Sequence, residues 1–353
     1  MMQAPASISE STDRVIRSEP CPRCYLCQAP GEMLYEGMRD RLFDAPGEWN
    51  LRRCPNGDCG LLWLDPMPTE EDIGKAYEVY YTHGEESAAG APTTLSLLHR
   101  AVRRIKQAYV DMEFNAASSQ LCRVLAVPIY LMPWYRADLE FPLRALSNPQ
   151  KGRMLDVGCG SGALVELAAR MGWNAEGIDV DPKAIESARR NCLTVHPGSL
   201  FDQHFPDAAF DLLISNHVIE HVHDPLPILR ECRRILSPKG KLVVATPNAK
   251  SILHARFLAN WFALDPPRHL HIFTPQSLRN LAVAAGFGDA EVRTTGRGAA
   301  STAIYSRSIR TFGRTTGDSF RLRFYLYGIL HSLRQARMTA SDVFAGEELM
   351  LEN

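Results

Sequence analysis

Three glycines separated by small residues form the stretch of this sequence best suited to chemistry. Residues 154–170 begin with an apolar run, pass through Gly158, Gly160 and Gly162, and continue with apolar residues at helical spacing. This order predicts a buried strand, a tight turn and an amphipathic helix. Glycine suits the turn because a ligand can approach closely where no Cβ atom is present. The unpaired N–H groups at the start of the helix would point toward that ligand.

Two carboxylates help to decide which ligand the loop would bind. The glycine spacing fits a dinucleotide as well as a nucleoside that carries no phosphate. Asp156, just before the turn, would repel a pyrophosphate but attract an ammonium or sulfonium group. Asp179 ends the next expected strand, where an acidic side chain can hold both hydroxyls of an adenosine ribose. Together the two acids favour a cationic nucleoside.

These residues resemble the class I S-adenosylmethionine-dependent methyltransferases. Residues 155–162 look like the first motif of that family and residues 177–182 like the second. Residues 210–225 resemble its fourth-strand motif and residues 236–248 its fifth. The resemblance implies an α/β fold with a doubly wound, Rossmann-like sheet of seven strands, the last of which we expect at residues 290–295. A dehydrogenase-type unit that binds a dinucleotide is the rival interpretation.

The resemblance also implies how S-adenosylmethionine is bound. Asp156 and the glycine loop would hold its methionine end, Asp179 its ribose, and the backbone near Ser199 and Leu200 its adenine. Many relatives carry an acidic residue where Ser199 stands, which leaves recognition by that side chain open. The expected cofactor-binding set is Asp156, Gly158, Cys159, Gly160, Gly162, Asp179, Ser199, Leu200 and Asn216.

Two histidines near the expected strand ends are candidates for proton transfer. Glu220 and His221 follow the fourth strand, and an imidazole with an unperturbed pKa of about 6.5 can act as a general base at neutral pH. His269 lies in residues 265–278, which resemble an Arg-His-x-x-x-Phe-Thr-x-x-Ser-Leu segment of the same branch. The alternatives are structural: Glu220 and His221 can shape the pocket floor, and the second loop can cap a helix at Thr274.

Two cysteine clusters near the start of the chain have the spacing of a zinc ribbon. Cys21, Cys24 and Cys27 form the first, and Cys54 and Cys59 the second. A module this small has too little core to fold alone, so a tetrahedral thiolate site would hold it together. Similarity to methyltransferases with an N-terminal Cys-rich module favours structural zinc on Cys24, Cys27, Cys54 and Cys59. A first pair of Cys21 and Cys24 is the alternative, and free, partly buried thiols are the other interpretation.

The remaining sequence suggests the domain boundaries. We expect a disordered lead (1–19), a zinc-ribbon-like module (20–66), a helical linker or lid (67–149), the methyltransferase domain (150–296) and a basic helical extension (297–353). Three tyrosines of the linker are candidate lid residues, although ordinary packing explains them equally well: Tyr77, Tyr80 and Tyr81.

Composition limits the partners and the location. The chain has 353 residues, of which 45% are hydrophobic and 22% charged, as in ordinary globular proteins. A net charge of −1 argues against general nucleic-acid binding. No secretory signal or membrane-spanning apolar run is visible, and nine cysteines fit reduced thiols and a metal site. We therefore expect a cytoplasmic protein; its oligomeric state stays open.

The interpretation that we favour is a methyltransferase that transfers the sulfonium methyl group of S-adenosylmethionine to a small molecule. The branch that it resembles includes enzymes acting on nucleotide-linked sugars and polysaccharide precursors, so a sugar-like acceptor is the leading expectation. The alternative is a quinone- or lipid-type acceptor with peripheral membrane contact, because residues 121–135 are apolar and the C-terminal segment is rich in arginine. A non-catalytic zinc-ribbon protein that binds S-adenosylmethionine is the third interpretation.

Overall fold

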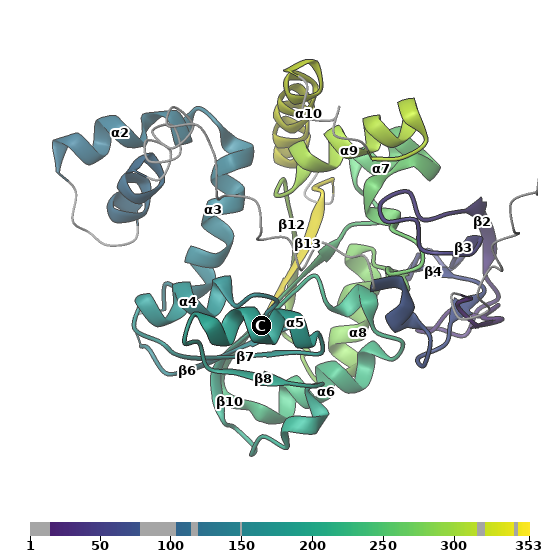
Figure 1. Cartoon of the computed structure of the whole chain (residues 1–353), viewed down its shortest axis with the longest axis horizontal. Helices are drawn as coiled ribbons and strands as arrows, with labels where there is room; N and C mark the ends of the chain where they lie inside the picture. Colours follow the sequence, from purple (N-terminus) through teal and green to yellow (C-terminus); the bar gives the residue numbers. More distant parts are fainter. Residues whose placement is uncertain (1–14, 78–103, 114–118, 149, 316–321, 342–344) are drawn as a thin grey trace, which may run out of the picture.

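A seven-stranded sheet forms the centre of the molecule (Figure 1). The computed structural model describes residues 15–77, 104–113, 119–148, 150–315, 322–341 and 345–353. The strand order is β12-β13-β10-β9-β6-β7-β8, in which only β13 runs antiparallel to its neighbours. This arrangement confirms the expected α/β, Rossmann-like sheet. Its strands are β6 (Arg153–Val157), β7 (Asn174–Asp179), β8 (Val195–Pro197), β9 (Phe210–Asn216), β10 (Leu236–Pro247), β12 (Glu291–Thr295) and β13 (Glu348–Glu352).

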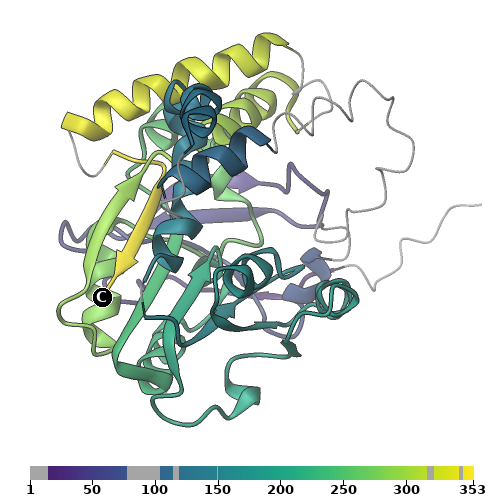
Figure 2. The ribbon, with the colours of Figure 1, turned by 90° about the vertical axis from the view of Figure 1, so that its left-hand side faces the viewer.

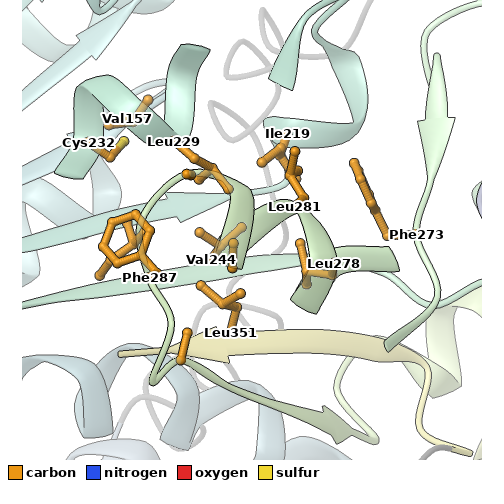
Figure 3. Close-up of a cluster of buried hydrophobic side chains, with 14 of the residues drawn as sticks. Val157, Ile219, Leu229, Cys232, Val244, Phe273, Leu278, Leu281, Phe287 and Leu351 are labelled. Carbon is orange, nitrogen blue, oxygen red and sulfur yellow. The ribbon is translucent and has the colours of Figure 1, made fainter. Parts of the chain in front are cut away.

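Helices cover both faces of this sheet because its strands carry apolar side chains on both sides. In β6, Met154 belongs to the core that includes α4 (Ala163–Arg170) and α5 (Pro182–Arg190). Its neighbour Leu155 belongs to the core beneath α6 (Pro225–Ile235) and α8 (Pro275–Ala284). Successive side chains of a strand point to opposite faces, which explains this alternation. Figure 3 shows the second core, in which side chains of α6 and α8 meet β10 and β13: Leu229, Cys232, Leu278, Leu281, Val244 and Leu351.

The seventh strand comes from the segment that we expected to be a helical extension. A strand does occupy the expected position near residues 290–295, but this strand, β12, is the sixth in chain order and lies at the sheet edge. The chain then forms α9 (Ala299–Phe312) and α10 (Leu322–Ser341) before β13 inserts between β10 and β12. The sequence pattern missed β13 because it is short and has an acidic residue at each end.

The N-terminal region (residues 15–77) shares a second sheet with the methyltransferase domain. The order of this sheet is β11-β4-β3-β2, and β11 (His271–Ile272) comes from the loop before α8. Its other strands are β2 (Glu32–Met38), β3 (Trp49–Arg53) and β4 (Leu62–Leu64), at the right of Figure 1. A smaller pair joins β1 (Ser18–Glu19) to β5 (Met67–Pro68), so the end of the expected disordered lead is a strand. Residues 1–14 lie outside the described part.

Four helices lie at the top of the molecule in Figures 1 and 2, toward the carboxyl ends of the parallel strands. They are α9, α10, α2 (Gln120–Tyr130) and α3 (Pro133–Leu146). Helix α10 packs on α9 and α3, and α2 packs on α3. No helix in the described part of the chain has the length and hydropathy that spanning a membrane requires. Residues 104–113 are also helical. The other short helices are η2 (Ile73–Tyr77), η4 (Phe201–Gln203), η5 (Ile219–His221), α7 (Ile252–Phe257), η6 (Leu258–Asn260) and η7 (Phe262–Leu264).

Candidate active site

The glycine loop joins β6 to α4, and its three glycines have different surroundings. A Cβ atom on Gly158 would lie 2.4 Å from Val218 Cγ2, and one on Gly162 would lie 2.5 Å from Leu193 Cδ1. Only at Gly160 is the surrounding space open, with no atom within 4 Å. All three have positive φ angles, of 76°, 53° and 82°. We expected ligand approach to require all three glycines; close protein neighbours explain Gly158 and Gly162, and Gly160 alone faces free space.

Asp156 precedes this loop in the chain, and Asp179 bonds to it from the end of β7. Asp156 is the penultimate residue of β6 and is only 4% exposed; burial, with a contribution from Asp179, raises the pKa of its carboxyl group to about 7. Asp179 Oδ2 accepts the Gly160 N–H at 2.8 Å, and Oδ1 accepts the Asp181 N–H at 2.8 Å. These bonds orient the Asp179 carboxylate and leave lone pairs for ligand hydroxyls. A cationic ligand beside Asp156 would favour its charged form.

Three further residues of the expected cofactor set have side chains that contact protein. Cys159 is buried among apolar side chains, and its N–H bonds the Ile178 carbonyl at 2.9 Å. The N–H and hydroxyl of Ser199 both donate to Asp202 Oδ2 at 2.7 Å. Leu200 is 2% exposed. A role for Ser199 and Leu200 in adenine recognition, and for Cys159 in cofactor binding, stays a prediction.

The structure brings the three expected catalytic residues together. A carboxylate oxygen of Glu220 and one ring nitrogen from each of His221 and His269 all lie within 4.8 Å of one another. The two imidazole rings are 4.7 Å apart between centroids and inclined at 71°. Glu220 and His221 are on η5, which directly follows Val218, the residue that contacts Gly158. The cluster therefore adjoins the cofactor loop.

Backbone carbonyls determine which nitrogen of each ring is free. His221 Nδ1 lies 3.0 Å from the Arg268 carbonyl, and His269 Nδ1 lies 2.8 Å from the Ala263 carbonyl. A carbonyl can only accept, so Nδ1 carries a hydrogen in both rings, and the neutral form of either ring has its lone pair on Nε2. Desolvation, together with the neighbouring His269, lowers the pKa of His221 to about 4. His221 is thus a neutral proton acceptor at pH 7.

Glu220 is fully buried but ionised. Its Oε1 lies 2.9 Å from His217 Nδ1, and its Oε2 accepts the Thr246 hydroxyl at 2.9 Å. Burial alone would raise the pKa of Glu220, but His217 outweighs this effect and holds the pKa at about 2. The second nitrogen of His217, Nε2, lies 2.9 Å from Glu348 Oε1 on β13. Desolvation opposes protonation of His217, yet Glu348 and Glu220 raise its pKa to about 10 and keep it cationic.

Arg297, just before α9, extends this charged network toward the helices at the carboxyl ends of the strands. Its Nη2 donates to Asn216 Oδ1 at 2.8 Å, and its Nη1 lies 3.4 Å from Glu348 Oε2. The guanidinium also lies 4.0 Å from the centre of the Phe141 ring. Asn216, expected to line the methionine side, is therefore held by an arginine. Sequence reasoning assigned no role to His217, Arg297 or Glu348; the Asn-His pair that ends β9 was the available signal.

Tyr77 is the one candidate lid tyrosine within the described residues. It ends η2, and its hydroxyl lies 3.0 Å from His221 Nδ1. Tyr80 and Tyr81 lie outside the described part of the chain. The N-terminal region therefore reaches the candidate proton acceptor.

A second cluster forms in the N-terminal region, where the sulfurs of four cysteines lie within 4.8 Å of one another: Cys24, Cys27, Cys54 and Cys59. Two sulfur–sulfur distances, 3.6 Å and 3.3 Å, are near the roughly 3.8 Å that bonds of about 2.3 Å imply for a tetrahedral zinc site. The thiol of Cys59 lowers the pKa of Cys24 to about 5. Cys21 is outside this group; its N–H donates to Asp65 at 2.6 Å. The alternative first pair, Cys21 and Cys24, is therefore not the one that the structure assembles.

Similarity to known proteins covers the methyltransferase part of the chain. Residues 135–292 match a family model described as a methyltransferase domain, which leaves out the cysteine cluster. Among solved structures, a SAM-dependent methyltransferase from Archaeoglobus fulgidus is 17% identical, with a TM-score of 0.40 over 69% of this chain and 96% of that chain.

Two curated relatives share the name ubiquinone biosynthesis O-methyltransferase. The protein from Cereibacter sphaeroides (strain ATCC 17025 / ATH 2.4.3) is 34% identical over 178 residues, which are 47% of this chain and 70% of that relative. The protein from Ralstonia nicotianae is 32% identical over 154 residues, 40% of this chain and 65% of that relative. With its sheet topology and acid-flanked glycine loop, the chain is an enzyme that belongs to the class I S-adenosylmethionine-dependent methyltransferases.

Proposed function

We propose that this methyltransferase transfers the methyl group of S-adenosylmethionine to a ring hydroxyl of a small, quinone-type acceptor. The observation that carries the proposal is the pair of imidazoles, His221 and His269, beside ionised Glu220; the Nδ1 atoms of both rings bond backbone carbonyls, which leaves Nε2 as the proton acceptor. A hydroxyl must lose its proton as it is methylated, and such a group can accept it. The names of the relatives support a quinone-type acceptor over the sugar-like acceptor that the sequence alone favoured.

The proposed reaction is a direct displacement at the methyl carbon. As the acceptor oxygen forms its bond to this carbon, the carbon–sulfur bond breaks and its electron pair stays on sulfur, which becomes a neutral thioether. The hydroxyl proton moves to Nε2 of His221 or His269, and the Glu220 carboxylate stabilises the imidazolium that forms. Asp156 and Asp179 hold the cofactor. Because the sulfonium is already activated, alignment of oxygen and methyl supplies most of the acceleration.

The Glu220 carboxylate and the two imidazoles of His221 and His269 also suit a divalent cation. Two imidazole nitrogens and one carboxylate oxygen are common ligands for such ions, and Nδ1–H bonds to backbone carbonyls are typical of metal-binding histidines. A cation bound there would lower the pKa of a coordinated acceptor hydroxyl. Dialysis against a chelator, followed by addition of Mg²⁺ or Zn²⁺, tests this version: lost and restored turnover would support it, and turnover that survives chelation would exclude it.

We also propose that the cysteine cluster holds structural zinc. Its four thiolates close a tetrahedron and leave no open position for a substrate. Metal analysis of purified protein should find zinc that is lost in Cys54→Ser and retained in Cys21→Ser. Retention of zinc by Cys54→Ser would contradict this ligand set.

Peripheral membrane contact fits a quinone-type acceptor that carries an apolar tail. On α2 and at its end, four apolar side chains are 48–72% exposed: Leu121, Val124, Val127 and Leu131. Such an exposed apolar stripe on a helix can enter a lipid interface. The wild type should sediment with phosphatidylglycerol vesicles, and the Val124→Glu variant should stay in the supernatant. Equal sedimentation of both proteins would contradict the membrane contact.

The main test compares acceptors. Purified protein is incubated with S-adenosylmethionine and either 3,4-dihydroxybenzoate or a nucleotide-linked deoxysugar, and S-adenosylhomocysteine is measured. We expect turnover with the catechol, loss of turnover in His221→Gln, and retention in His254→Gln. His254 is the matched control because its Nδ1 also bonds a backbone carbonyl, that of Ala249 at 2.6 Å. Turnover with the sugar nucleotide alone would overturn the proposal.

A further inference from the structure

Arg268 is completely buried between the N-terminal region and the candidate active site. Its side chain and that of its partner Asp40 are both 0% exposed, although 228 residues separate them in sequence. Arg268 Nη1 lies 2.8 Å from Asp40 Oδ2, and Nη2 lies 2.9 Å from Oδ1. This bidentate geometry fixes the orientation of the guanidinium group, in addition to the attraction between the two charges. The reaction described above makes no use of the pair.

Hydrogen bonds satisfy the whole guanidinium group. Beyond its bonds to Asp40, Arg268 donates from Nε to Asp265 Oδ2 at 3.0 Å and from Nη2 to the same carboxylate. Nη1 also donates to the Ala76 carbonyl at 3.1 Å. The Phe43 ring is 4.7 Å from the guanidinium carbon. One side chain thus joins the segment after β2, the residue before Tyr77 and the loop that carries His269.

The backbone of the same arginine orients His221, and it belongs to the turn that carries His269. The Asp265 carbonyl accepts the N–H groups of Arg268 at 2.9 Å and of His269 at 3.1 Å. The Arg268 carbonyl accepts from His221 Nδ1 at 3.0 Å. Because the side chain is anchored at five donors, the backbone on which both rings depend is held in place.

A second contact from the N-terminal region reaches the same ring. The Ala76 carbonyl is bound by Arg268, and the next residue, Tyr77, places its hydroxyl 3.0 Å from His221 Nδ1. The Arg268 carbonyl and the Tyr77 hydroxyl therefore both contact Nδ1 of His221. The carbonyl can only accept, so it favours the form in which Nε2 is free to accept a proton, whereas the Tyr77 hydroxyl can donate or accept and serves to hold the ring in place.

Stability alone is a weak reason for this buried pair. The cost of removing two charges from water largely cancels their attraction, and apolar residues of similar volume often stabilise a protein equally well. We propose that Asp40 and Arg268 are positioning residues for the His221–His269 pair, and that Tyr77 assists them, so that the N-terminal region forms part of the acceptor site. This inference rests on the proposed function of that pair.

The first experiment uses Asp40→Asn and Tyr77→Phe in the full-length protein with 3,4-dihydroxybenzoate as acceptor. We expect each substitution to lower kcat at least tenfold while the S-adenosylhomocysteine dissociation constant stays within twofold of wild type. The matched control is Tyr35→Phe, because the Tyr35 hydroxyl also lies 3.0 Å from a histidine nitrogen, Nε2 of His254, away from the cluster. The control should retain wild-type kcat. Equal kcat values for Tyr77→Phe and Tyr35→Phe would overturn the role of Tyr77.

A double-mutant cycle separates positioning from general damage. In a His221→Gln background, Asp40→Asn and Tyr77→Phe should have little further effect, because the ring that they position is absent. If Asp40→Asn and Tyr77→Phe lowered kcat by the same factor in the wild-type and His221→Gln backgrounds, the proposal would be overturned. If thermal unfolding measurements show that Asp40→Asn does not fold, Arg268→Lys replaces it in the cycle. This substitution keeps the positive charge but removes the bidentate guanidinium group.

Failure of the proposed function is distinguishable from failure of the positioning role, because the wild type would then not methylate 3,4-dihydroxybenzoate at all. Nitrogen-15 NMR of the histidine rings tests the positioning role without turnover. We expect His221 to carry its hydrogen on Nδ1 in the wild type and in Tyr35→Phe, and to show a mixture of tautomers in Asp40→Asn. An unchanged Nδ1–H signal in Asp40→Asn would overturn the inference.

Discussion

The proposed cofactor side and the proposed acceptor side of this active site are assembled in different ways. Most of the expected cofactor-binding residues come from one continuous stretch, residues 153–181, in which strand, loop, helix and strand follow one another, and three come from later in the chain: Ser199, Leu200 and Asn216. The acceptor side combines the end of β9, the loop before β11, Tyr77 from the N-terminal region and Glu348 from β13. A local motif can therefore stay constant while distant segments adapt the acceptor site. The two sides should respond independently to substitution.

The largest effect should come from removing both imidazoles of the acceptor side. His221→Gln combined with His269→Gln should lower turnover by about 10²–10⁴, the usual contribution of a general base. Calorimetric titration with S-adenosylhomocysteine should show unchanged affinity. Weakened cofactor binding in this variant would contradict the hypothesis that the cofactor side and the acceptor side respond independently to substitution.

The reciprocal substitution on the cofactor side is Asp179→Ala. Two hydrogen bonds from ribose hydroxyls to a charged carboxylate contribute about 1.5 kcal/mol or more each, so affinity for S-adenosylhomocysteine should fall by roughly a hundredfold or more. Asp181→Ala is the matched control because Asp181 caps α5 through the Lys183 N–H. Similar affinities for the two variants would contradict ribose binding by Asp179.

Disruption of the cysteine cluster should damage the acceptor side first. Cys54→Ser should lower the melting temperature by about 4–8 °C, which corresponds to roughly 2 kcal/mol in a domain of 150–250 residues. Turnover should fall more than cofactor affinity because Asp40 and Tyr77 contact only the acceptor side. Cys21→Ser, outside the cluster, should melt like the wild type. Equal losses of turnover and affinity would argue for general unfolding instead.

The smallest effect is a difference in pH dependence. Burial raises the pKa of Asp156 to about 7, and the sulfonium cofactor favours the ionised carboxylate. Affinity for S-adenosylmethionine should therefore fall by up to about tenfold for each pH unit below 7. The pKa of His221 is about 4, so this base stays neutral across the same range and kcat at saturating cofactor should stay flat down to about pH 5. Calorimetry and kinetics from pH 5 to 8 test both expectations.

The same contrast explains what sequence could predict. The glycine loop, Asp179 and the strands around them follow from local patterns, and so does the cap of α8, where Thr274 and Ser277 form reciprocal hydrogen bonds. Glu220, His221 and His269 were recognisable as residues of the right chemical type. Asp40, the partner of Arg268, and Glu348, the partner of His217, were not recognisable, because nothing in local sequence shows that a distant carboxylate faces a given histidine or arginine.

The position of β13 has a consequence for how the protein is made. β10 bonds β9 on one side, but its other edge pairs only with β13, which is synthesised after α7, α8, β12, α9 and α10. Until β13 emerges from the ribosome, β10 exposes the backbone donors and acceptors of an unpaired strand edge, which readily pairs with other chains. Pairing across such a sequence separation also slows folding. The nascent chain therefore passes through an aggregation-prone stage that ends when Glu348 reaches His217 and the acceptor side is completed.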